Sequence, residues 1–209
     1  MLILIGLAVL LPGAAMAQDR IGRDSPDNER EILNRLGDAR IYRSHATHEV
    51  SMIGAPDRQD PIARPAGLSA GVSPESAART YLSRYGELFG LHDQASELQS
   101  EETRSAGKGR TLVRFQQVHD GVPVLGGELN VQLTDANELL AANGEVLPGV
   151  SLDTEPTVSA EEARKTAIAK IAKERGMKAS ALKAARPHLW IYDPTLHGGP
   201  GVRTSHLVW

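Results

Sequence analysis

Apolar residues recur at helical spacing after Ser73, and this is the clearest periodic pattern in the chain. Ser73 is a good N-cap, Pro74 suits the first helical position, and Glu75 favours the positive end of a helix. These signals predict a helix that begins at Pro74 and ends at the glycines within residues 86–90. Its expected buried stripe consists of Ala77, Tyr81, Leu82, Tyr85 and Leu88.

Alternating apolar and polar residues follow, as in the strands of an antiparallel sheet. After a loop at residues 105–110, residues 111–119 and 127–135 are predicted strands, and Asp120–Gly121 is a hairpin turn dipeptide. In the second strand Leu129, Val131 and Leu133 are expected to face one way, and Glu128, Asn130 and Gln132 the other. Residues 138–150 continue in β form, with Asn143–Gly144 predicted as a turn or bulge.

Proline and glycine interrupt this sheet in the stretch RFQQVHDGVPVLGGELNVQL, residues 114–133. Pro123 has no N–H to donate, so it belongs on a sheet edge or at a bulge. Gly126 and Gly127 allow the backbone to bend sharply or to approach another surface closely. The sequence therefore predicts a bent strand at this place.

A second helix and two further strands are predicted after residue 157. Ser159 and Glu162 form a Ser-x-x-Glu capping box, and Gly176 is a stop signal. The expected buried stripe is Ala160, Ala163, Ala167, Ile168, Ile171 and Ala172. Residues 188–193 and 205–209 are apolar enough for strands. The fold class is therefore α+β, with two consecutive helix-plus-antiparallel-sheet units at residues 67–151 and 152–209.

The first 66 residues are expected to lie outside these units. Residues 1–17 resemble a secretory signal peptide, with an apolar run, a Pro-Gly break and a small-x-small site for cleavage between Ala17 and Gln18. A membrane anchor is the alternative, but the run is shorter than the roughly 20 apolar residues that span a bilayer. No Lys or Arg precedes the run, which departs from the signal-peptide pattern. Residues 18–66 are predicted to be a weakly ordered, flexible lead-in and linker with at most a short helix near Ile32, Leu33 and Leu36.

Composition narrows the function classes. The 209 residues carry a formal net charge of −3, which argues against a sequence-independent nucleic-acid binder. The chain has no cysteine, so disulfides and thiolate chemistry are excluded. Aromatic residues make up only 4%, so the core must consist mainly of Leu, Val, Ile and Ala.

Candidate catalytic groups are few. His45, His48 and Glu49 have a spacing that could suit a metal, but a solvated polar segment is the favoured interpretation. The string HEVSM has Met52 where His-Glu-x-x-His needs its second histidine. His188, His197 and His206 are expected on the surface or partly packed. No Gly-x-Ser-x-Gly elbow is present, and the GGPG run is followed by no Lys-Ser or Lys-Thr. We therefore predict no catalytic, cofactor-binding or metal-binding residue in this chain.

The interrupted strand pair resembles the fungalysin/thermolysin propeptide domain, which opens the precursors of secreted thermolysin-like zinc metallopeptidases. The residues that carry the resemblance are Gly121, Val122, Pro123, Val124, Gly126 and Gly127, followed by Asn143, Gly144 and Pro148. Residues 152–209 resemble the PepSY domain that comes next in such precursors, and both units would then be cystatin-like. The PepSY resemblance breaks off before its final strand pair and the peptidase domain is missing, so we expect the chain to be truncated before the catalytic domain.

The resemblance implies a secreted or periplasmic prosegment that acts as an intramolecular folding chaperone and inhibitor of the protease. Its partner would be a thermolysin-like metallopeptidase domain, in cis or in trans after cleavage, with no nucleic acid and no membrane anchor after signal removal. Zinc, with calcium as a further candidate, is implied for the missing peptidase domain and not for this chain. The bend at Pro123 is interpreted as architectural, with a surface that docks on the protease as the alternative. A free-standing exported inhibitor or binding protein remains the alternative function, and an exported enzyme lacks a catalytic constellation.

Overall fold

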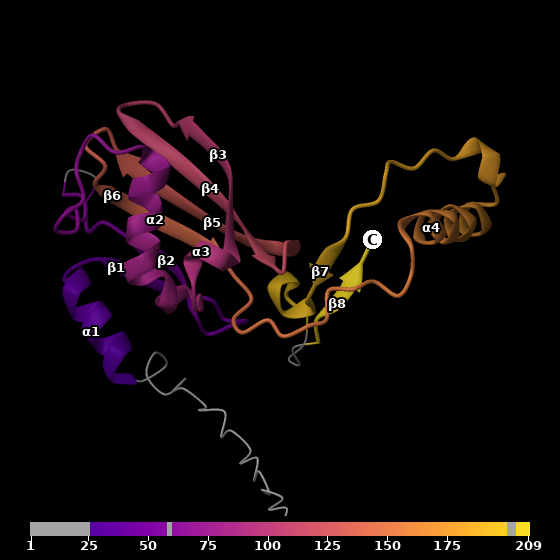
Figure 1. The fold of residues 1–209 in the computed structure, drawn as a ribbon, viewed down its shortest axis with the longest axis horizontal. Coiled ribbons are helices and arrows are strands. Elements are labelled where there is room, and N and C mark those ends of the chain that lie inside the picture. Colours follow the sequence, from indigo (N-terminus) through magenta and orange to yellow (C-terminus); the bar gives the residue numbers. More distant parts are fainter. Residues whose placement is uncertain (1–25, 58–59, 200–203) are drawn as a thin grey trace, which may run out of the picture.

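A six-stranded antiparallel sheet is the centre of the protein. The computed structural model describes residues 26–57, 60–199 and 204–209. The strands run in the order β1-β2-β6-β5-β4-β3 (Figure 1). Their bounds are β1 Arg40–Arg43, β2 Val50–Gly54, β3 Leu98–Ser105, β4 Arg110–His119, β5 Val122–Thr134 and β6 Leu139–Glu145. The helices of this part are α1 Pro26–Leu36, α2 Pro74–Tyr85, α3 Gln94–Glu97 and the 3-10 turn η1 Gly86–Phe89. The α+β class is therefore confirmed. We call residues 26–148 the body.

The main hydrophobic core lies between α2 and one face of this sheet. Ser73 caps α2 as expected, accepting a hydrogen bond from the Ser76 amide. The predicted helix stripe is buried, as are the inward residues of β5, Leu129, Val131 and Leu133. The two faces of β5 thus follow the alternation of its sequence, because successive strand side chains point to opposite sides.

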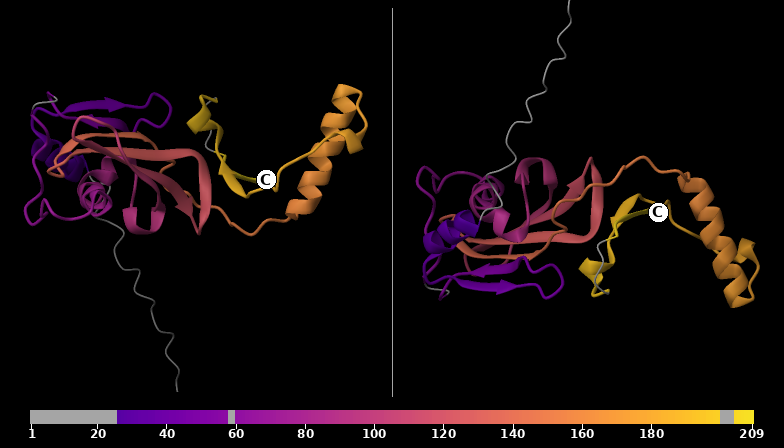
Figure 2. Two further views of the ribbon diagram at one scale, coloured as in Figure 1. Left: turned by 90° about the horizontal axis from the view of Figure 1, so that it is seen from above. Right: turned by 90° about the horizontal axis from the view of Figure 1, so that it is seen from below.

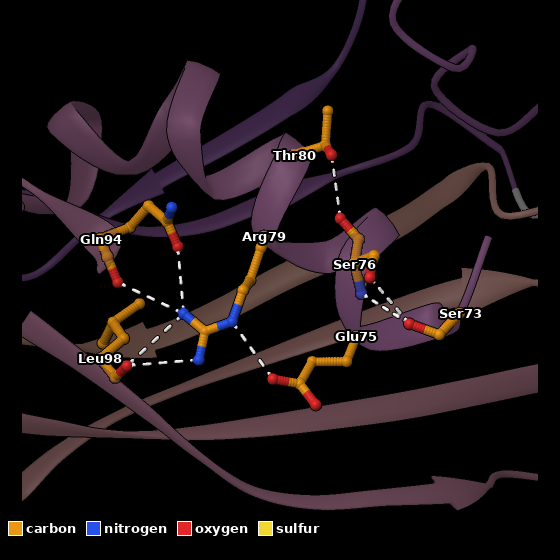
Figure 3. A network of polar contacts seen from close by, with 7 residues as sticks. All are labelled: Ser73, Glu75, Ser76, Arg79, Thr80, Gln94 and Leu98. Atoms are coloured by element: carbon orange, nitrogen blue, oxygen red, sulfur yellow. Dashed lines mark hydrogen bonds and ion pairs between the residues drawn. The ribbon is translucent and has the colours of Figure 1, made fainter. Parts of the chain in front are cut away.

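Arg79 connects α2 to the strands next to it (Figure 3). Its Nε lies 3.2 Å from the Glu75 carboxylate, and Nη1 donates to the Gln94 side-chain oxygen at 3.3 Å. Nη2 donates to the Leu98 carbonyl at 3.4 Å. The guanidinium carbon lies 5.1 Å from the centroid of the Phe115 ring, within range of a cation–π contact. One side chain therefore ties α2 to α3, β3 and β4.

Residues 26–57 belong to the body, so the prediction of a weakly ordered lead-in is wrong for them. Ile32 and Leu36 lie on one face of α1 and are buried in the main core, together with Val50 and Ile53 of β2. Strand β2 pairs with β6, and β1 pairs with β2. The polar and turn-rich composition gave no alternation that would predict the two strands, because each is short and only one of them is deeply buried. The predicted leader at residues 1–17, with Ala17 and Gln18, lies outside the described residues.

Asn143 and Gly144 form neither a turn nor a bulge. Both residues lie inside β6, where they pair with Asn130 and Leu129 of β5 without a register shift. Gly144 has φ +141°, and a Cβ there would lie 2.0 Å from the Glu128 carbonyl oxygen. The glycine is needed because β5 passes so close, which explains an Asn-Gly pair in mid-strand.

The second predicted helix forms, but it does not pack as expected. Helix α4, Ala160–Arg175, has the Ser159–Glu162 capping box and ends at Gly176 in the left-handed conformation. Of the expected stripe only Ala172 is buried, and Ile171 is 44% exposed. Figure 2 shows the reason: α4 stands away from the sheet in both views. The 3-10 turn η2, Ala179–Ala181, follows it. No helix among the described residues is long and apolar enough to cross a membrane.

The last strands join the body. β7, Trp190–Tyr192, pairs antiparallel with β8, His206–Val208, as the apolar runs predicted. β7 also pairs in parallel with β5, where Ile191 lies opposite Val124. The 3-10 turn η3, Pro194–His197, follows β7. The second sheet is thus attached to the first at one place, the interrupted part of β5.

Candidate functional site

The interruption in β5 is a large bulge with several extra residues. Gln116 of β4 pairs with Glu128, and Val118 pairs with Pro123. One residue of β4, Gln117, therefore faces the four residues 124–127 of β5. Pro123 lies between the hairpin turn and this bulge, in agreement with its missing N–H. Asp120 and Gly121, both with positive φ, form the predicted turn.

Two buried glutamines hydrogen-bond to the backbone in the bulge and beside it. Gln116 donates through Nε2 to the carbonyls of Val124 at 2.6 Å and Gly127 at 2.8 Å. Gln117 donates to the Leu147 carbonyl at 2.8 Å and accepts from the Leu147 amide at 2.7 Å. The two side chains are only 4% and 1% exposed. Since buried polar groups without partners are costly, these contacts hold the bulge in one shape.

The two glycines of the bulge are required for different reasons. Gly126 has φ +82°, which most side chains disfavour. Gly127 lies against Gln117, whose Oε1 would be 2.7 Å from an added Cβ. A side chain at position 127 would thus displace the glutamine that supports the bulge. Sequence reasoning identified both glycines but missed Gln116 and Gln117, although two adjacent amides inside an apolar strand are a usable signal.

The bulge is also the joint to the C-terminal strands. Val124, Leu147 and Ile191 form a second buried cluster, separate from the main core. His197 Nε2 lies 3.1 Å from the Leu125 carbonyl oxygen, and its ring stacks on Tyr192 at 5.2 Å between centroids. A Cβ at Gly126 would lie 3.1 Å from that imidazole. The small residues at the bulge thus let η3 approach the backbone.

Beside the joint, the outer face of the sheet carries an open groove of about 690 Å³. Its lining comes from three strands of the body and from β7: Gln99, Ser100, Glu101, Glu102, Arg114, Gln116, Pro123 and Trp190. Arg114 donates to the Glu128 carboxylate at 2.7 Å, and its Nε lies 3.3 Å from Glu101. The hydrogen bond that Arg114 donates to Glu128 raises the pKa of Arg114 above its usual value. Carboxylates, amides, one guanidinium and two apolar rings suit contact with a polypeptide surface.

The remaining predicted positions lie apart from this groove. Pro148 follows β6 and packs against Gly90, where an added Cβ would lie 2.6 Å from its ring. His45 and His48 are in the connection between β1 and β2. Among residues 26–57, 60–199 and 204–209, no group of three or more His, Asp or Glu side chains is arranged to hold a metal.

Part of this sequence is similar to known proteins, and the similar region includes the bulge. Residues 96–146 match the family described as Fungalysin/Thermolysin Propeptide Motif. Thermolysins of Alicyclobacillus acidocaldarius subsp. acidocaldarius and of Bacillus caldolyticus are each 29% identical over 126 residues, which cover 58% of this chain and 23% of the relative. The transglutaminase-activating metalloprotease of Streptomyces mobaraensis is 34% identical over 84 residues, 39% of this chain and 11% of the relative. The chain thus spans less than a quarter of the length of these relatives. The matched motif comprises β3 to β6 and contains the whole bulge.

Proposed function

We propose that this chain is the prosegment of a secreted thermolysin-like zinc metalloendopeptidase, which it helps to fold and keeps inactive. The observation that carries the proposal is the propeptide motif at residues 96–146. That motif coincides with four neighbouring strands and with the glutamine-supported bulge. A rigid sheet of this kind suits a template, because a preorganised surface loses little entropy when it binds.

One activity accounts for both roles. A surface complementary to the near-native peptidase stabilises the folding transition state, and it also binds the finished enzyme. While the two parts are covalently joined, the prosegment acts at an effective concentration of the order of millimolar. Cleavage ends this advantage, so release follows processing. Zinc, with calcium as a further candidate, would belong to the peptidase domain.

The other parts of the chain have roles that follow from this proposal. Residues 1–17 direct export and are removed at Ala17–Gln18. Residues 152–209 are a PepSY-like unit that leads from the propeptide domain to the peptidase. The supporting features are the apolar start of the sequence and the helix and strand pair after residue 159.

Refolding and inhibition of a relative test the proposal. Denatured peptidase domain of Bacillus caldolyticus thermolysin is diluted into buffer with or without an equimolar amount of the purified chain. We expect the chain to raise the yield of active enzyme severalfold, and to slow peptide hydrolysis when it is added to native enzyme. An equimolar unrelated protein of similar size is the control. Unchanged yield and unchanged hydrolysis would contradict both roles.

The covalent arrangement is tested separately by reading the coding sequence that follows the codon of Trp209. A His-Glu-x-x-His motif within the next few hundred codons would support a prosegment in cis. A stop codon without such a motif would favour the free-standing inhibitor.

A further inference from the structure

Positive charge is concentrated in one part of the chain. Residues 159–189, which we call the arm, contain eight Lys and Arg but three Asp and Glu. The rest of the sequence contains 15 basic and 23 acidic residues. The arm therefore carries a formal charge of +5 on a protein whose total is −3, so its positive charge is a local feature and not a property of the whole composition.

Few of these charges are neutralised within the structure. Among the described residues, Glu161 forms both ion pairs of the arm, with Arg164 at 3.5 Å and with Lys165 at 3.9 Å. The other six cations form no ion pair with any described residue: Lys170, Lys173, Arg175, Lys178, Lys183 and Arg186. In the body, by contrast, Arg35, Arg43, Arg79, Arg104 and Arg114 each face a carboxylate.

Apolar side chains are mixed with these charges on the surface of α4. Arg164, Ile168, Ile171 and Arg175 follow one another at spacings of four, three and four residues, which places them on one face of the helix. Ile171 is 44% exposed, and Met177 just beyond the helix is 47% exposed. Arginine and methionine are enriched in protein interfaces, and burial of an exposed isoleucine side chain on binding is favourable.

We propose that the arm docks on an acidic face of the peptidase domain, where its unpaired cations and the Arg164–Ile168–Ile171–Arg175 stripe meet carboxylates around an apolar centre. This inference rests on the proposed function and names the charge of the partner surface. The arm stands clear of the body (Figure 2), and its six unpaired cations are all exposed. Their charge steers the encounter, and the isoleucines contribute buried area after contact.

Association kinetics with a charge-reversed arm test this inference. The complete chain and its variant Lys170→Glu, Lys173→Glu, Lys178→Glu are compared in binding to catalytically inactivated Bacillus caldolyticus thermolysin by surface plasmon resonance. We expect the variant to associate at least about tenfold more slowly at 20 mM salt, because close charge complementarity raises association rates by orders of magnitude. For the unaltered chain, we expect the association rate to fall at least about fivefold between 20 and 300 mM salt.

Two matched variants exclude indirect effects. The triple change to Arg at the same positions keeps the charge and should retain the association rate of the unaltered chain. Lys108→Glu in the β3–β4 loop of the body changes one charge far from the arm in sequence, and should have less than a twofold effect. Circular dichroism confirms that each variant keeps its helix content.

The outcomes separate this inference from the proposed function. If the unaltered chain binds thermolysin and inhibits it, but the charge-reversed arm associates equally fast, the docking of the arm is overturned and the proposed function stands. If the unaltered chain neither binds nor inhibits, both are overturned. A dimer in light scattering that is lost on charge reversal would assign the arm to a second copy of the chain, and would overturn the inference as well.

Discussion

The main helices of the body and of the arm, α2 and α4, have the same type of N-cap but differ in how they pack. Ser73 caps α2 and Ser159 caps α4, and each accepts a hydrogen bond from the amide three residues later. Helix α2 buries five residues against the sheet, whereas α4 buries only Ala172. The capping signals determine where a helix begins, but a neighbouring sheet determines whether its apolar positions are buried. The body should therefore be cooperative, and the arm should open independently of it.

The largest expected difference between the two regions is in amide hydrogen exchange. An isolated helix of 16 residues is marginal in water, so α4 amides should open with less than about 1 kcal/mol. Amides of β4 and β5 should exchange only through global unfolding, which costs about 5–10 kcal/mol. Mass spectrometry of peptides from both regions should show protection at least about a thousandfold higher in the body. Equal, strong protection across residues 157–209 would contradict an independent arm.

Substituting one glycine in each region sharpens the comparison. A Cβ at Gly144 would lie 2.0 Å from the Glu128 carbonyl oxygen, inside the sheet. Gly144→Ala should therefore destabilise the body by more than about 4 kcal/mol, seen in urea unfolding. Gly176 has φ +62° with nothing within 4 Å of its Cβ position, so Gly176→Ala should cost about 1 kcal/mol and affect α4 alone. Similar losses from the two changes would mean that β5 and β6 separate more easily than the structure indicates.

Because β7 joins the body at the bulge, a change in the bulge should also destabilise the C-terminal strands β7 and β8. Gln117→Ala removes two hydrogen bonds to Leu147 and leaves buried backbone groups unpaired, at a cost of about 3 kcal/mol. Both tryptophans, Trp190 and Trp209, lie in or next to the β7–β8 hairpin, so their fluorescence reports on it. The unfolding transitions followed by tryptophan fluorescence and by circular dichroism should shift together in the variant. Gln99 is exposed, so Gln99→Ala is the control and should change the free energy of unfolding by less than about 0.5 kcal/mol.

Alkaline pH should weaken the body through Tyr81. Burial raises the pKa of Tyr81 to about 12, and its hydroxyl donates to the Asn137 carbonyl at 3.1 Å. The unfolded chain loses this proton near pH 10, so the stabilisation is complete below pH 10 and is lost as the pH rises towards 12. The loss should reach about 2 kcal/mol in urea unfolding. Tyr81→Phe has no such proton, so a variant with the same loss above pH 10 would exclude Tyr81 as the cause.

Sequence reasoning succeeded where the signal was local. The caps at Ser73 and Ser159, the Asp120–Gly121 turn and the alternation of β5 all depend on neighbours in the chain, and all are found in the structure. It failed where contacts between segments distant in the sequence determine the local structure. The strands β1 and β2 are stabilised by pairing that reaches β6 some 90 residues later, and Gly144 is required by the approach of β5.

The candidate site shows the same division. Pro123, Gly126 and Gly127 revealed an interrupted strand, because each residue type restricts its own backbone. The sequence could not reveal which groups fill the interruption, since Gln117 reaches Leu147 thirty residues away. It also could not reveal that the joint to β7 forms there, because that contact depends on a strand of three residues.

The smallest expected effect is the most direct test of independence between the two regions. Ser73→Ala and Ser159→Ala each remove one N-cap hydrogen bond, which is worth about 1 kcal/mol of helix stability. In α2 this loss should lower the free energy of unfolding of the whole body by the same amount, because the helix cannot open without exposing Tyr81 and its neighbours. In α4 the loss should leave body unfolding unchanged and appear only as faster exchange of the α4 amides. If Ser159→Ala instead lowered the stability of the body by about 1 kcal/mol, α4 would be coupled to the sheet in solution. Its cations would then be less available to a partner than we propose.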